Sequence, residues 1–108
     1  MLKEYNKLVR NRIPERIIKN GETPYTRVLD DYEYSVELIK KLKEECKEVE
    51  TATTKEDILE ECADVLQVLE DVAKINKYTL EDIINIKKNK EEKRGSFDKK
   101  IFLESVEE

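Results

Sequence analysis

Apolar residues recur at helical spacing through most of this chain, and that periodicity limits the fold more than any other feature. Between about residues 31 and 52, one stripe is formed by Leu38, Ile39, Leu42, Cys46 and Val49. Between about residues 55 and 77, a second stripe is formed by Ile58, Cys62, Val65, Leu69 and Val72. Residues three and four positions apart share one face of an α-helix. Since the 108 residues include only two Gly and two Pro, we predict a mainly α-helical protein built as an antiparallel helix bundle.

Capping signatures mark where the helices begin. In each signature an acid follows a capping residue by three positions, as in a capping box: Asp30 with Glu33, Thr54 with Asp57, and Thr79 with Asp82. They predict helices over about 31–52, 55–77 and 80–94, and Gly95 suits the end of the last one. Pro14 and Gly21 suit the first turn and the end of a shorter helix near the N-terminus.

Two short stretches outside the helical segments are rich in residues that favour β-strands. They read TPYTRVL from Thr23 to Leu29, and SFDKKIFLE from Ser96 to Glu104. We expect these stretches to form a small two-stranded β element from residues near 24–29 and 97–103. No domain boundary and no low-complexity tract interrupts the chain, so the sequence predicts a single domain over residues 1–108.

The composition excludes several classes of protein. The net charge is −5, which argues against binding duplex nucleic acid. No apolar run approaches the roughly 20 residues that cross a bilayer, and no signal-peptide pattern follows Met1, so we expect a cytoplasmic protein without a membrane partner. Cys46 and Cys62 are expected to be reduced and to face the core. The chain has no His, which excludes Ser–His and Cys–His hydrolysis.

The triplet Glu-Glu-Cys occurs twice, and each time a carboxylate follows the second Glu by three residues. The resulting pairs are Glu45 with Glu48, and Glu61 with Asp64. At about 100° per residue, Glu45 lies about 20° from Leu38, at the edge of one apolar stripe. Glu61 falls inside the other stripe, where an unpaired carboxylate is costly. Solvated surface charge and a buried salt bridge to Lys or Arg are the simpler explanations of these acids.

A divalent metal ion accounts for both acidic pairs together. An antiparallel connection near residues 51–54 can place the two pairs opposite each other. Mg²⁺, with Mn²⁺ as the alternative, prefers such oxygen ligands. The absence of His disfavours softer metals and di-iron carboxylate sites. Because Mg²⁺ is usually shared between carboxylates and substrate phosphates, we expect a substrate that carries phosphate.

Basic residues gather at two places in the sequence. Lys87, Lys90 and Arg94 continue the helical line of Ile83, so an apolar stripe becomes basic toward its end. These bases either complement the dipole at the end of the helix or contact substrate phosphate. Near the N-terminus, the bases Lys7, Arg10 and Arg12 are either surface charges or further phosphate ligands.

The residues quoted above resemble a known superfamily. Glu45-x-x-Glu48, twelve residues, then Glu61-x-x-Asp64 is similar to the signature of the MazG-like all-α nucleoside triphosphate (NTP) pyrophosphohydrolases. That superfamily includes dimeric dUTPases and phosphoribosyl-ATP pyrophosphohydrolases. The opening YNKLVRNRIPERI and the ending KRGSFDKKIFLE resemble a subgroup of predicted house-cleaning NTP pyrophosphatases. The resemblance extends over nearly the whole chain, which implies one domain of this superfamily over residues 1–108. The subgroup usually has Asp where Asn11 stands, and the ending has Ser96 where the subgroup has Gly.

The resemblance implies a Mg²⁺-dependent enzyme that cleaves a nucleoside triphosphate between its α- and β-phosphates, giving a nucleoside monophosphate and pyrophosphate. The implied metal ligands are Glu45, Glu48, Glu61 and Asp64. Either Glu45 or Glu48 would take the proton of the attacking water, and substrate phosphate would be bound by Lys87, Lys90, Arg94, Arg10 and Lys7. The resemblance also implies a homo-oligomer, a dimer or larger. Two other functions stay open at this point: a nucleotide- or metal-binding regulatory module without turnover, and a structural helical oligomer.

Overall fold

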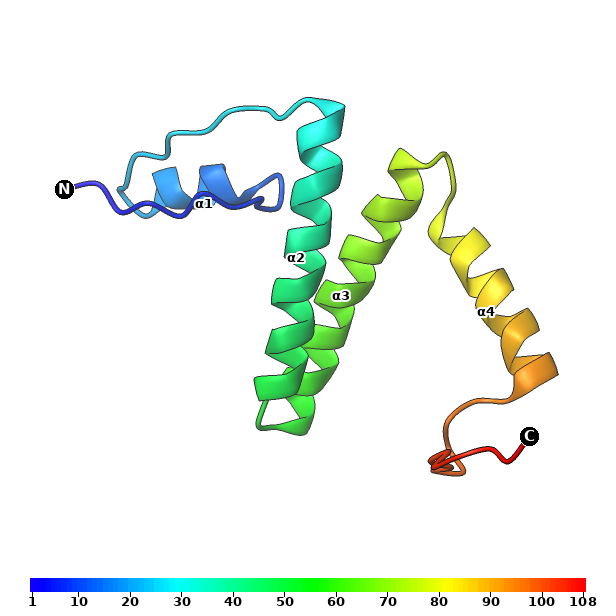
Figure 1. Cartoon of the computed structure of the whole chain (residues 1–108). Coiled ribbons are helices and arrows are strands. Elements are labelled where there is room, and N and C mark those ends of the chain that lie inside the picture. The colour runs from blue at the N-terminus through cyan, green and yellow to red at the C-terminus, as the bar shows by residue number, and fades with distance from the viewer.

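The computed structural model describes all residues, 1–108, and consists of four α-helices joined by loops, with no β-strand. The helices are α1 (Ile13–Lys19), α2 (Asp31–Thr51), α3 (Lys55–Ile75) and α4 (Leu80–Arg94). Figure 1 shows α2 and α3 as an antiparallel hairpin, with α4 continuing from the open end of α3. Contacts between helices are confined to α2 with α3 and α3 with α4. None of the helices is long and apolar enough to cross a membrane.

The predicted helix starts are confirmed. The side chain of Asp30 accepts a hydrogen bond from the backbone N–H of Glu33 at 2.8 Å, and Thr54 Oγ1 accepts one from the N–H of Asp57 at 3.1 Å. Thr79 and Asp82 form the complete reciprocal capping box. Such bonds satisfy N–H groups that have no partner inside the helix, which fixes the residue where the helix begins. Gly95 follows α4 with a positive φ of 79°, as its position predicted.

The predicted two-stranded β element near 24–29 and 97–103 is wrong. Both stretches are irregular, and Figure 1 shows them on opposite sides of the molecule. The preference of a residue for a strand reflects packing on a neighbouring strand, and an isolated pair of strands is marginal in water. Here Val28 is 97% exposed and Phe97 is 99% exposed, so neither has a surface to pack on. The first stretch is tied instead to α2, because Arg27 donates two hydrogen bonds to Glu33.

The interior of the protomer is small. Only Leu38, Val68 and Ala73 are buried, one on α2 and two on α3, the helix that contacts both α2 and α4. The radius of gyration is 18.3 Å, whereas a compact chain of this length has about 13 Å. The solvent-accessible surface is 10506 Å², against about 6,300 Å² for a compact monomer of 12.8 kDa. The chain therefore contains one packed hairpin, α2 with α3, in place of the full helix bundle expected from the sequence, and α4 diverges from that hairpin (Figure 1).

The expectation that both cysteines face the core is also wrong for the protomer. Cys46 and Cys62 are free thiols, as predicted, but both are exposed. They lie on the apolar stripes, and those stripes are wider than a two-helix contact can cover. Leu59 and Leu66, which flank Cys62 on α3, are 72% and 45% exposed. Part of the apolar surface predicted from the sequence therefore faces solvent in the single chain.

Leu38 should contribute more to stability than any exposed apolar residue, because it is only 2% exposed at the α2–α3 contact. We expect Leu38→Ala to lower the free energy of unfolding by about 2–5 kcal/mol, through lost burial and the cavity left behind. The matched control is Val28→Ala, at a position that is 97% exposed, and it should change stability by no more than about 0.5 kcal/mol. Urea unfolding followed by circular dichroism measures both. Equal effects would contradict the assigned core.

Candidate metal centre

Three of the four predicted carboxylates are brought together by the α2–α3 hairpin. Glu45 comes from α2, and Glu61 and Asp64 come from α3. One oxygen from each residue lies within 4.8 Å of the others. Glu61 and Asp64 are three residues apart and therefore share a face of α3, and the antiparallel packing sets Glu45 against them. We call Glu45, Glu61 and Asp64 the acidic cluster.

The fourth predicted ligand, Glu48, lies outside this group. Its side chain is exposed, one helical turn along α2 from Glu45. It is still close enough for its charge to act on Glu61. The structure therefore places three carboxylates within reach of one ion and a fourth at the margin.

Glu61 has the least favourable electrostatic environment in the cluster. Partial desolvation is the main reason that the pKa of Glu61 is raised above its ordinary value, and the negative charges of Asp64, Glu48 and Glu45 raise it further. No Lys or Arg forms an ion pair with Glu61. The surroundings of Glu61 therefore destabilise its ionised form, and a bound cation would stabilise that form.

The other two carboxylates of the cluster each have a basic partner. Lys41 lies 3.6 Å from Glu45, whose side chain is only 13% exposed. Arg10 donates a hydrogen bond of 2.7 Å to Asp64. Sequence reasoning missed both pairs. The spacing of Lys41 and Glu45, four residues apart on one helix, is a signal that could have revealed the first pair. The pair of Arg10 with Asp64 joins residues 54 positions apart and had no local signal.

The N-terminal segment thus runs past the acidic cluster. Besides the contact of Arg10 with Asp64, Lys7 lies 3.6 Å from Glu44, the partly exposed neighbour of Glu45 in the sequence. Two of the predicted phosphate ligands, Lys7 and Arg10, are therefore placed beside the acids by the fold. Both remain half-exposed, with 43% and 56% of their side-chain surface accessible.

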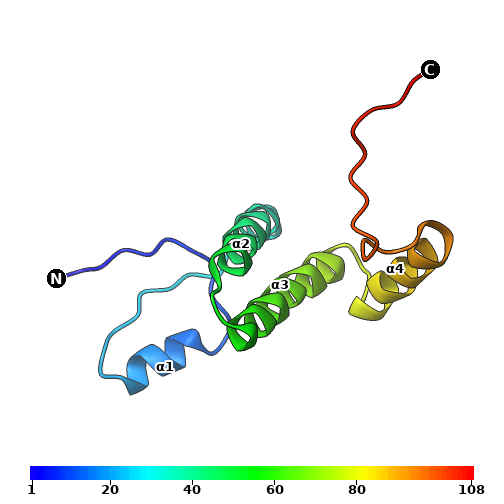
Figure 2. The ribbon, with the colours of Figure 1, turned by 90° about the horizontal axis from the view of Figure 1, so that it is seen from below.

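The bases of α4 are not brought to the cluster in one protomer. Lys87 pairs with Glu91 on its own helix at 2.8 Å. Lys90 and Arg94 are exposed and form no ion pair. Figures 1 and 2 both show the C-terminal end of α4 set apart from the part of the hairpin near the α2–α3 turn, where the cluster lies. The predicted acidic and basic elements therefore lie apart within the single chain.

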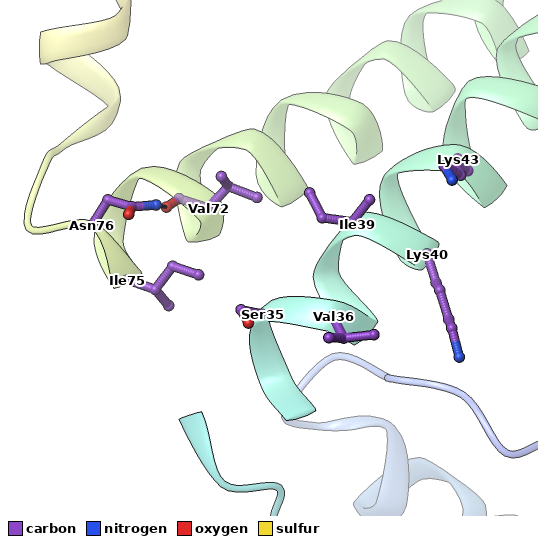
Figure 3. Close-up of a pocket in the computed structure, with 8 residues that line it drawn as sticks. All are labelled: Ser35, Val36, Ile39, Lys40, Lys43, Val72, Ile75 and Asn76. Atoms are coloured by element: carbon purple, nitrogen blue, oxygen red, sulfur yellow. Dashed lines mark hydrogen bonds between the residues drawn. The ribbon is translucent and has the colours of Figure 1, made fainter. Parts of the chain in front are cut away.

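An open groove lies elsewhere on the hairpin, toward its open end. It has a volume of about 580 Å³ and is lined by Ser35, Val36, Ile39, Lys40, Lys43, Val72, Ile75 and Asn76 (Figure 3). At about 100° per residue, Ile39 and Val36 point roughly 120° and 180° away from Glu45 around α2. The groove and the acidic cluster are consequently separate features.

Comparisons with known proteins assign the chain to a family. Residues 2–91 match the sequence model of the phosphoribosyl-ATP pyrophosphohydrolase family. The chain is also similar to an uncharacterized protein of Mycolicibacterium smegmatis, with 49% identity over 53 residues. That match covers 49% of this chain and 54% of the relative, so the chain spans about half the length of the curated relative it matches. No solved structure is significantly similar to the chain.

Without metal, Glu61→Gln should raise the melting temperature. A carboxyl whose pKa is raised by folding holds its proton more tightly in the folded state, so its ionisation at neutral pH opposes folding. The amide removes that charge and keeps the shape of the side chain. Thermal melting in EDTA measures the change. The control is Glu60→Gln at the exposed neighbouring position, which should melt like the wild type. A lower melting temperature for Glu61→Gln than for the wild type would show that the charge of Glu61 does not destabilise the folded chain.

Proposed function

Since the chain belongs to the phosphoribosyl-ATP pyrophosphohydrolase family, within the MazG-like all-α NTP pyrophosphohydrolase superfamily, we propose a specific reaction for it. The substrate is a nucleoside triphosphate, with damaged or non-canonical triphosphates included, as in a house-cleaning role. Mg²⁺-dependent hydrolysis between the α- and β-phosphates releases a nucleoside monophosphate and pyrophosphate. The observation that carries the proposal is the acidic cluster, three carboxylates on a packed hairpin with oxygens within 4.8 Å.

The donors of the cluster fit a hard divalent cation. They are all carboxylate oxygens, the ligands that Mg²⁺ and Mn²⁺ prefer, and neither His nor a cysteine thiol takes part. Glu45, Glu61 and Asp64 would hold the ion, with Glu48 as a fourth ligand or as a ligand to its water. When bound, the ion supplies positive charge that polarises a phosphoryl oxygen and acidifies water. The three carboxylates meanwhile fix its position relative to the helices.

Glu48 is the better candidate for the general base. It is exposed and forms no ion pair, so its carboxylate is free to accept a proton from water. Glu45 is already engaged by Lys41, and its pairing favours the role of a fixed ligand. This division leaves Glu45, Glu61 and Asp64 to bind the ion while Glu48 handles the proton.

Phosphate binding would draw on two groups of bases. Arg10 and Lys7 stand beside the cluster and can turn from their present acids toward a phosphate held there. Lys87, Lys90 and Arg94 lie on α4, away from the cluster of their own chain. We propose that α4 meets the acidic cluster through a homo-oligomer, a dimer or larger. The open shape of the protomer supports this, because its exposed surface exceeds that of a compact monomer by roughly 4,000 Å².

Pyrophosphate release tests the proposed function directly. The protein should release pyrophosphate from one or more members of a panel of normal and damaged nucleoside triphosphates, and only when Mg²⁺ or Mn²⁺ is added. Glu61→Gln should lose most of this activity, whereas Glu60→Gln should keep it. Stabilisation by Mg²⁺ and nucleotide without any turnover would indicate a regulatory binding module. An absence of both responses would indicate a structural oligomer.

Arg94→Gln should separate substrate binding from metal binding. A hydrogen bond to a charged group contributes about 1.5–3 kcal/mol, so kcat/KM for the preferred triphosphate should fall at least about tenfold. Affinity for Mg²⁺ without nucleotide should change little, or rise slightly as a nearby positive charge is lost, because Arg94 is proposed to bind phosphate and not the carboxylates. Lys88→Gln, at another exposed base of α4, is the control. If Arg94→Gln instead breaks the oligomer and leaves the kinetics of the intact form unchanged, Arg94 is a structural residue.

A further inference from the structure

The chain that follows α4 is an apolar segment with nothing to cover it. We call residues 96–108 the C-terminal arm. Phe97, Ile101 and Phe102 are 99%, 84% and 87% exposed. The hydrogen bonds of the arm are confined to its own residues, such as that from Lys100 N–H to the carbonyl of Phe97 at 3.1 Å. The arm also lies outside residues 2–91, the part that matches the family. A long exposed apolar segment of this kind indicates a docking partner.

The charges of the arm identify what it would dock on. Its end carries Glu104, Glu107 and Glu108, and none of them forms an ion pair in the protomer. Asp98, Lys99 and Lys100 lie earlier in the arm, so the excess of negative charge is at its end. That end fits a surface that offers unpaired bases.

The surface around α1 offers that combination. A shallow depression of about 340 Å³ is lined by Arg12, Glu15, Arg16 and Lys19. The three bases form no ion pair in the protomer. Ile18, on the same helix, is 62% exposed. We call this surface the α1 basic surface. Its unpaired positive charges complement the acidic end of the arm, and Ile18, about 60° round the helix from Glu15, adds an apolar contact at the edge of the surface.

The arm of one chain lies away from the α1 basic surface of the same chain. Figure 1 shows α1 and the arm on opposite sides of the molecule, whose longest dimension is 61 Å. Figure 2 shows the arm starting beside α4 and running away from both α4 and α1. A second copy of the chain can present the same basic surface directly to the arm.

We propose that the C-terminal arm of one protomer docks on the α1 basic surface of a second copy. Glu104, Glu107 and Glu108 face Arg12, Arg16 and Lys19, and the apolar residues of the arm cover Ile18 and its surroundings. The exposed surface in excess of a compact monomer, roughly 4,000 Å², is several times the 800 Å² or so that each partner commonly buries in a stable interface. The proposal does not depend on the proposed activity, because none of these residues belongs to the proposed catalytic machinery.

Charge reversal with rescue tests this docking. The arm variant carries Glu104→Lys, Glu107→Lys and Glu108→Lys, and the surface variant carries Arg12→Glu, Arg16→Glu and Lys19→Glu. Each alone should weaken self-association at least about tenfold, because attraction between exposed charges becomes repulsion. The variant with all six substitutions should recover the association of the wild type. Light scattering and sedimentation over a range of concentrations give the association constants, and circular dichroism checks that each variant is folded.

A matched control reverses three acids elsewhere. Glu50, Glu56 and Glu60 are exposed and form no ion pair, and their replacement by Lys changes the net charge as much as the arm variant does. This control should associate like the wild type. Three results would overturn the proposal: unchanged association in the arm variant, no recovery in the variant with six substitutions, or unchanged association after truncation at Gly95. If the variant with six substitutions recovers the melting temperature while no variant changes the mass of the assembly, the arm docks on its own chain. That result would also overturn the proposal.

Discussion

The close approach of α2 and α3 is the constraint on which the rest of the site depends. Leu38 and Val68 are buried at this contact, and the same packing holds Glu45 of α2 against Glu61 and Asp64 of α3. Burial of apolar side chains therefore offsets the mutual repulsion of the three carboxylates, which would otherwise hold them apart. Lys41 reduces that repulsion at Glu45, and Arg10 reduces it at Asp64. No Lys or Arg forms an ion pair with Glu61. The remaining unfavourable charge is what makes the hairpin suited to a divalent cation.

The acidic side chains of the hairpin and the basic side chains of α4 lie apart because the single chain has an open shape. The hairpin carries the acids, the N-terminal segment reaches them through Arg10, and α4 carries further bases at a distance. A single chain leaves Cys62 and its flanking leucines exposed on α3, and leaves the C-terminal arm without contacts. The proposed homo-oligomer would cover these surfaces, since a chain of this size that folds alone buries much more of its surface.

Local features of the sequence predicted the helices well. Each N-cap bond joins residues three positions apart, so the starts of α2, α3 and α4 could be located from neighbouring residues. The acidic cluster was predictable for a related reason, because helical spacing and one short turn fix the relation of Glu45 to Glu61. That the two β-favouring stretches stay irregular was not predictable, since strand formation depends on a partner that the sequence does not identify. The pairing of Arg10 with Asp64 and the exposure of Cys46 depend likewise on how distant segments are placed.

Binding of a divalent cation by the acidic cluster can be measured by calorimetric titration of Mg²⁺ in the absence of nucleotide. The wild type should show saturable binding, and Glu61→Gln should bind with strongly reduced affinity, because it loses a ligand charge without a change in the shape of the side chain. Glu60→Gln should bind as the wild type does. Equal Mg²⁺ affinity for Glu61→Gln and the wild type, or no saturable binding to either, would contradict the account.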